Sequence, residues 1–258
     1  NFFFVIGAVL LWLKFSGFGK NIFAVLIAGI FTFNFFPFYT LLERGQIDGL
    51  TFLLLTAGIF LIRKQRNIAA GVFFAVASVF KFYCLLLIPF LLFKKKFNTV
   101  ISFIGSVVVI ISAMYLFNGT PLVNDYIFNQ LPRISEFAES GTEDMKIDSW
   151  ILKNYFTISR YSISLIEGQP FVSESISFFS KASLIKVITS VQGKAGLNLS
   201  STFWSAILYI LILFLFGRNI RSYSTLYQWT IIILVILICS PFTWVMNLVW
   251  LLSVLFVV

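Results

Sequence analysis

The sequence has no histidine, few charged residues and only two cysteines. Without histidine, this stretch can build no His-ligated metal site and use no His general base. Only 11% of its 258 residues are charged, whereas soluble domains carry ~25%, so an ordinary soluble domain is excluded. Cys84 and Cys239 both fall in apolar segments and are expected to be packing residues, not a disulfide. We expect no metal, no cofactor and no nucleic-acid partner.

Hydrophobic residues make up 59% of the chain, and several apolar stretches approach the ~20 residues that cross a bilayer. The composition predicts an all-α, polytopic membrane protein embedded in a lipid bilayer. Because the chain begins at Asn1 inside one apolar run and ends inside another, we expect a fragment of a larger protein, with one transmembrane domain over 1–258. The expected apolar segments are 2–13, 21–42, 49–62, 68–93, 99–117, 203–217, 226–240 and 242–258.

These segments form two groups of membrane helices, at 1–117 and 203–258, joined by a long polar connection at 118–202. A single crossing by 68–93 would put the basic turns RKQR and KKK on opposite faces, against the positive-inside rule. A re-entrant or broken hairpin, with arms 68–80 and 82–93, puts both turns on the cytoplasmic face. We favour the hairpin; the alternative is one long tilted helix with a polar kink.

In the hairpin arrangement the charges separate by sign. All ten acidic residues fall on the outer side, so that 118–202 becomes an extracytoplasmic loop. The cytoplasmic loops collect ten basic residues: Lys14, Lys20, Arg63, Lys64, Arg66, Lys94, Lys95, Lys96, Arg218 and Arg221.

Lys81 stands alone in the middle of the apolar segment 68–93. A lysine at the bilayer centre costs roughly 2.5–3.5 kcal/mol on insertion scales. Each arm of the hairpin would be ~18 Å long, which carries its tip past the bilayer midplane. There Lys81 either snorkels or pairs structurally, or it is held as a cation for an anionic ligand. We favour the interpretation that Lys81 is held as a cation for an anionic ligand.

Residues 44–97 contain a Gly-Gln pair (Gly45, Gln46), a short apolar helix, a basic turn, Lys81, Pro89 and a second basic cluster. This order and spacing resembles the core of glycosyltransferase family 87, as does "SPFTWVMNLVWLL" at 240–252. The resemblance implies a GT-C-like helical bundle in the plasma (inner) membrane. It implies a hexosyltransferase that moves a sugar, with mannose expected, from a polyprenyl-phosphate donor to a glycolipid or glycan acceptor on the extracytoplasmic side.

The chain departs from the family's pattern at two places. Val245, Met246 and Asn247 follow Trp244 where the family has Asp-His-His, and Asp48 stands where the family usually has Asn. The family's essential aspartate in the first outer loop would lie before Asn1. The catalytic base therefore stays unassigned, and Asp48 is the candidate within this chain.

Transfer from a lipid phosphate needs a carboxylate base and groups that stabilise the departing phosphate. The residues expected to bind substrate are Lys81, Arg44, Gln46, Trp244 and Asn247. Arg44 is otherwise an interface anchor, Gln46 a polar turn residue, Trp244 a member of the aromatic belt, and Asp48 a helix N-cap.

Two other functions fit parts of the pattern. A transporter or flippase of a lipid-linked or anionic substrate would also bury a lysine beside a lipid-accessible cavity. Transporters often show broken helices in matching halves, however, and only one broken segment is predicted here, which favours an enzyme. A polysaccharide polymerase or ligase would instead use a lipid-diphosphate donor.

Overall fold

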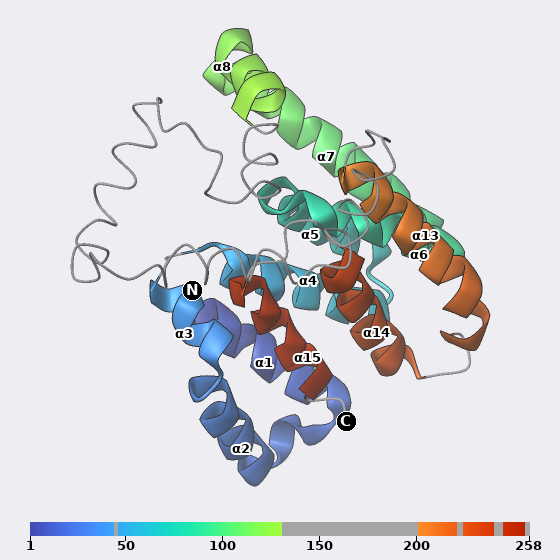
Figure 1. The fold of residues 1–258 in the computed structure, drawn as a ribbon. Coiled ribbons are helices and arrows are strands. Elements are labelled where there is room, and N and C mark those ends of the chain that lie inside the picture. Colours follow the sequence, from blue (N-terminus) through green and yellow to red (C-terminus); the bar gives the residue numbers. More distant parts are fainter. Residues whose placement is uncertain (44–45, 131–200, 221–223, 240–244, 256–258) are drawn as a thin grey trace, which may run out of the picture.

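The computed structural model describes residues 1–43, 46–130, 201–220, 224–239 and 245–255, and this part of the chain contains helices and no strands (Figure 1). The prediction of an all-α fold is therefore confirmed. The α-helices are α1 Phe2–Ser16, α2 Ile22–Phe33, α3 Phe36–Glu43, α4 Asp48–Arg63, α5 Asn67–Phe80, α6 Leu87–Phe93, α7 Phe97–Asn118, α8 Thr120–Asp125, α13 Ser201–Ile220, α14 Thr225–Cys239 and α15 Leu252–Leu255. Shorter turns are the 3-10 segments η1 Phe18–Lys20, η2 Phe82–Leu86 and η5 Val245–Leu251, and the π-helical turn η3 Tyr126–Gln130.

Helix α7 is the one described helix that is both long and apolar enough to cross a membrane. It has 22 residues, or ~33 Å, and only 11% of its most apolar window is buried. Its outward face carries large apolar side chains, as expected of a surface that meets lipid. The other apolar helical stretches are 10–17 residues long where their side chains are described, and Ala206–Leu215 of α13 is one of them, so the prediction of many crossings stays a prediction.

Helices α1 and α4 run parallel and pack against each other. Near one end, the backbone of Asn1 lies against Gly49. In the middle, the Trp12 indole donates to the Thr56 hydroxyl at 3.0 Å. At the other end, the Arg63 guanidinium donates to the Phe15 carbonyl at 2.5 Å and stacks 4.7 Å from that residue's ring. These contacts fix which ends of the two helices lie together.

Helix α5 turns back along α4 and packs on its other side against α7. Both contacts use a glycine at the point of closest approach. A Cβ at Gly58 would lie 2.4 Å from the Phe74 ring, and a Cβ at Gly71 would lie 2.6 Å from the Thr99 carbonyl oxygen. Glycine therefore lets α5 approach both neighbours.

The helical path breaks at Lys81, between α5 and η2. Lys81 has an extended backbone (φ −141°, ψ 100°), and the chain continues through η2 into α6. The break keeps its hydrogen bonds: the Lys81 N–H donates to the Ala77 carbonyl at 3.0 Å, and the Cys84 N–H donates to the Lys81 carbonyl at 2.9 Å. The chain thus changes direction at the one cation of this segment.

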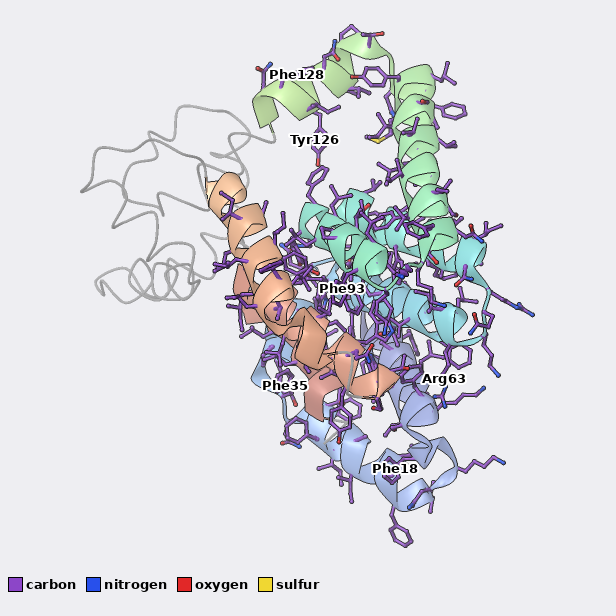
Figure 2. The ribbon with its side chains drawn as sticks, turned by 90° about the vertical axis from the view of Figure 1, so that its right-hand side faces the viewer. Phe18, Phe35, Arg63, Phe93, Tyr126 and Phe128 are labelled. Atoms are coloured by element: carbon purple, nitrogen blue, oxygen red, sulfur yellow. The ribbon has the colours of Figure 1, made fainter. Side chains whose placement is uncertain are left out.

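Three basic turns lie at one end of the bundle, on the right in Figure 1: the turn after α1, the turn between α4 and α5, and the turn between α6 and α7. The Ser102 hydroxyl donates to the Ile68 carbonyl at 2.7 Å, which brings the start of α7 to the start of α5. The Arg63–Phe15 bond adds the turn after α1, and Lys94 bonds Gln228 at the start of α14. Figure 2 views the molecule from this side. We call it the basic end.

Two of the expected segments differ from the structure. The segment 21–42 is interrupted at Asn34–Phe35, because Pro37 has no N–H for the Phe33 carbonyl and its ring would clash with that carbonyl in a continuous helix. In the first turn of α3, Pro37 is tolerated. The segment 242–258 forms the 3-10 turn η5 and one turn of α-helix over its described residues. Of the polar connection, 118–130 is helical except at Gly119, which separates α7 from α8, and the rest lies outside the described residues.

The close approach of α5 to α7 predicts that Gly71→Ala lowers stability although alanine favours helix. The new methyl would meet backbone atoms of Thr99 and Phe103, which cannot move aside cheaply. We expect the free energy of unfolding to fall by about 1–3 kcal/mol, the usual cost of overpacking. The control is Gly105→Ala on α7, where nothing lies within 4 Å. This variant should be neutral or stabilised by up to about 1 kcal/mol. Equal melting temperatures for the two variants in detergent would contradict the packing.

Candidate functional site

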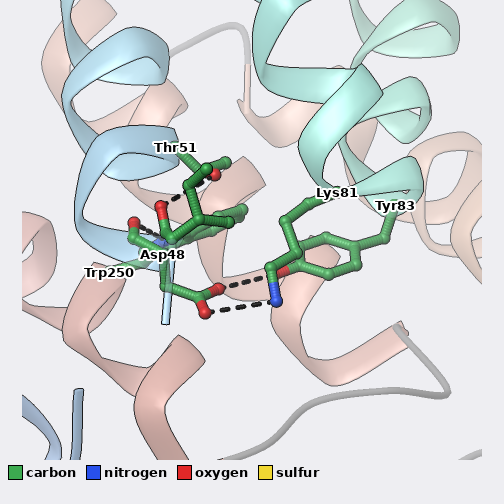
Figure 3. Close-up of polar contacts among 6 residues, drawn as sticks. Asp48, Thr51, Lys81, Tyr83 and Trp250 are labelled. Carbon is green, nitrogen blue, oxygen red and sulfur yellow. Dashed lines mark hydrogen bonds and ion pairs between the residues drawn. The ribbon is translucent and has the colours of Figure 1, made fainter. Parts of the chain in front are cut away.

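A buried ion pair joins the start of α4 to the break after α5. The Lys81 ammonium lies 3.1 Å from Oδ2 of Asp48 (Figure 3). The Asp48 side chain is fully buried, whereas 21% of the Lys81 side chain is exposed. The carboxylate is therefore enclosed by the protein, and only the Lys81 side chain of the pair is partly exposed.

The antiparallel course of α4 and α5 brings these two residues together. Asp48 is the first residue of α4, and Lys81 follows the last residue of α5. Both therefore lie at the end of this helix pair away from the RKQR turn. At 1.5 Å per residue, the 16 residues of α4 separate the ion pair from the basic end by ~24 Å.

Two aromatic residues complete the surroundings of Asp48. The Tyr83 hydroxyl donates to Oδ1 of Asp48 at 3.4 Å, and the Trp250 indole donates to the Asp48 carbonyl at 3.4 Å. The Tyr83 and Trp250 rings pack with centroids 5.2 Å apart. Since Trp250 belongs to η5, the site joins α4, the Lys81 break, η2 and a segment some 200 residues further along the chain.

Charge and exposure give the two members of the pair different chemical abilities. An ammonium has three donors, and Asp48 occupies one direction around it. The exposed part of Lys81 can present the remaining donors to an anion that approaches from outside. Asp48, which is fully buried, cannot meet a substrate hydroxyl in this arrangement. The geometry therefore suits Lys81 as a contact to an anionic ligand and Asp48 as its support.

The structure brings together two of the residues that the sequence singled out, in a pairing that the sequence did not predict. The N-cap interpretation of Asp48 is wrong: Ile47 is the N-cap of α4, and the Asp48 carboxylate turns away to Lys81 and Tyr83. A lone acid and a lone base in neighbouring apolar segments were the signal for the pair. Nothing in the sequence indicated Trp250, because its partner is so distant along the chain.

The other predicted site residues are placed incompletely. Gln46 is partly buried and lies two residues before Asp48. Asn247 lies in η5, the segment that carries Trp250, but its side chain is outside the described part. Arg44 and Trp244 lie outside the described residues. Among the residues that the structure describes, no cluster of three or more metal-ligating side chains is found.

The described part of the chain is a strongly apolar helical bundle with one long, largely exposed apolar helix and a buried ion pair at a helix break. These features are typical of a membrane protein with a polar site. Residues 1–166 match the model of glycosyltransferase family 87, which is well over half of the chain. The chain belongs to this family, and it is a glycosyltransferase that uses a sugar donor and an acceptor. Neither a curated protein nor a solved structure matches it significantly.

The burial of Asp48 predicts that Lys81→Met destabilises the protein. The change leaves a carboxylate in the interior without its counter-charge, which costs about 3–5 kcal/mol in comparable pairs. Asp48→Asn combined with Lys81→Met removes both charges and should regain most of this loss. Melting temperatures of both variants in the same detergent measure the effect. A Lys81→Met protein as stable as the double variant would show that the pair adds nothing to folding.

Proposed function

We propose that this glycosyltransferase transfers a hexosyl group, with mannose expected, from a polyprenyl-phosphate donor to an acceptor hydroxyl on a glycolipid or glycan. The reaction would take place within a GT-C-like bundle in the plasma membrane, on its extracytoplasmic side. The observation that carries the proposal is the ammonium of the partly exposed Lys81 side chain, held by a buried carboxylate at a helix break of a family 87 protein.

Lys81 would bind the phosphate of the donor. During transfer, negative charge accumulates on the departing lipid phosphate, and a fixed cation stabilises it most in a poorly hydrated site. The surroundings suit an amphiphile, because large apolar side chains on either side of Lys81 are exposed: Phe80 (39%), Phe82 (47%) and Leu85 (37%). When the donor phosphate is bound at Lys81, the isoprenoid chain of the donor would pack along these side chains.

Asp48 would act as a positioning residue and not as the base. Its carboxylate lies 3.1 Å from the Lys81 ammonium on the inner side, and this contact keeps the Lys81 side chain in one orientation. A general base must instead lie within hydrogen-bond reach of the acceptor hydroxyl. The complete burial of Asp48 favours the supporting role.

The remaining candidates would surround the same end of the bundle. Gln46 would orient substrate with its amide, and Arg44 would add a second phosphate contact. Trp244 would stack on a sugar face, and Asn247 would donate a hydrogen bond to the donor phosphate. The position of Trp250 against Asp48 supports a site near η5, since Trp244 and Asn247 precede it within one short stretch.

The extracytoplasmic orientation predicts the accessibility of three introduced cysteines. The basic end groups Lys64 with Lys95, which the positive-inside rule places in the cytoplasm. Lys64→Cys and Lys95→Cys should label only from the cytoplasmic side with an impermeant thiol reagent, and Ser140→Cys only from outside. Opposite sidedness for positions 64 and 95 would contradict both the hairpin and the placement of Lys81.

The division of roles predicts different activities for two variants that both fold. Asp48→Asn keeps the cation and should retain transfer from a polyprenyl-phosphate sugar within about tenfold. Asp48→Asn combined with Lys81→Met lacks the cation and should lose about 10²–10³-fold, as when one charge-stabilising donor is removed. The measurement is transfer of labelled sugar in proteoliposomes, with nucleotide sugar as the negative control.

Three results would oppose the proposal. Loss of all transfer in Asp48→Asn with normal donor binding would make Asp48 the base. Full activity of the double variant would remove Lys81 from the site. Movement of the labelled lipid between leaflets without transfer to any acceptor would favour the flippase alternative.

A further inference from the structure

Two of the basic turns have the same backbone structure, 30 residues apart. One joins α4 to α5 and the other joins α6 to α7. In the first, the bonds are Lys64 N–H to Phe60 O (3.1 Å), Gln65 N–H to Ile62 O (3.0 Å) and Arg66 N–H to Leu61 O (2.9 Å). In the second they are Lys94 N–H to Phe90 O, Lys95 N–H to Leu92 O and Lys96 N–H to Leu91 O, all at 2.9 Å. We call them the twin turns.

Each twin turn holds a residue other than glycine in the left-handed region. Gln65 has φ +59° and Lys95 has φ +56°. Such a conformation is unfavourable for a residue with a side chain, and glycine would adopt it at no steric cost. The chain nevertheless places a lysine and a glutamine there, both exposed. The side chains at these two positions therefore project outward from equivalent points.

The basic end presents cations with no described acid to neutralise them. The two acidic side chains that the structure describes are Asp48, at the start of α4, and Asp125, beyond the end of α7. Some cations are engaged internally: Lys14 and Lys64 both approach the Phe60 ring. Arg66 and Lys95 are exposed and have no side-chain partner within the described part of the chain.

A large apolar side chain lies next to each group of cations. Ile68, two residues after Arg66, is 69% exposed, and Phe97, directly after Lys96, is 56% exposed. Leu92, within the second twin turn, is 45% exposed. This pairing suits the boundary of a bilayer, where apolar side chains enter the acyl region and lysines meet phosphates. A free phosphate ion would gain nothing from the apolar neighbours.

We propose that the twin turns bind the headgroup phosphates of anionic phospholipids at the membrane surface. Arg66 and Lys95 supply the charge, and Ile68 and Phe97 contact the first methylene groups of the acyl chains. This site is separate from Lys81, at the opposite end of α4 and α5. It would hold the start of α5 and the start of α7 at a fixed depth in the bilayer.

The equivalence of the turns allows matched gain and loss variants. Lys95→Gln gives the second turn the residue that the first already holds in the same conformation, and Gln65→Lys does the reverse. Both variants should therefore fold. The probe is fluorescent phosphatidylglycerol, titrated into the full chain in neutral detergent, with phosphatidylcholine of the same acyl chains as reference. We expect the dissociation constant to rise roughly fivefold in Lys95→Gln and to fall by a similar factor in Gln65→Lys, the weight of one cation near an anionic surface.

Lys146→Gln removes one positive charge elsewhere in the chain and should change the dissociation constant less than twofold. Unchanged affinity in both turn variants would overturn the proposal, and so would an equal loss in Lys146→Gln, which would mean that only net charge counts. Displacement of the lipid by millimolar inorganic phosphate would show that a free anion occupies the site. Sugar transfer is not part of this assay, so its outcome is independent of the proposed reaction.

Discussion

The arrangement of this protein depends on a carboxylate that is fully buried and can be tolerated there only beside a cation. An unpaired charge in such a place costs several kcal/mol, so Asp48 requires Lys81 within a few ångströms. That requirement fixes the end of α5 against the start of α4 and gives the break at Lys81 a structural reason. Tyr83 donates a hydrogen bond to Oδ1 of Asp48, and Trp250 donates one to the Asp48 backbone carbonyl, which attaches η2 and η5 to the same residue.

The pair also separates two tasks within a site of little polar surface. Asp48 faces inward and holds the surrounding elements together, and Lys81 faces outward and can contact a ligand. A lysine without a buried partner would extend toward the nearest water. Because Asp48 binds the ammonium from inside the protein, Lys81 stays at the break in the helix, among exposed phenylalanine and leucine side chains. A lipid phosphate has the matching combination of charge and hydrocarbon.

Composition was sufficient for the helical class, and the placement of the basic turns was sufficient for the break at Lys81. The family was recognised from the order and spacing of motifs in 44–97, which are also local features of the sequence. Lys81 was conspicuous as a lone cation between two basic turns. The pairing with Asp48 was missed, since a residue before a helix is read first as a cap. Trp250 could not be found, because only the folded chain brings η5 to α4. The interruption before Pro37 was predictable from proline's missing N–H and was not weighed against the apolar run.

Exchange of the two charges tests the central claim most directly. The protein Asp48→Lys/Lys81→Asp keeps an ion pair but turns the anion toward the surface. The account predicts that its melting temperature lies well above that of Lys81→Asp alone, whereas its transfer from a polyprenyl-phosphate sugar is lost, because a carboxylate repels the donor phosphate. Transfer at the wild-type rate by the exchanged protein would contradict the account, since the site would then need an ion pair and not a cation that faces the donor.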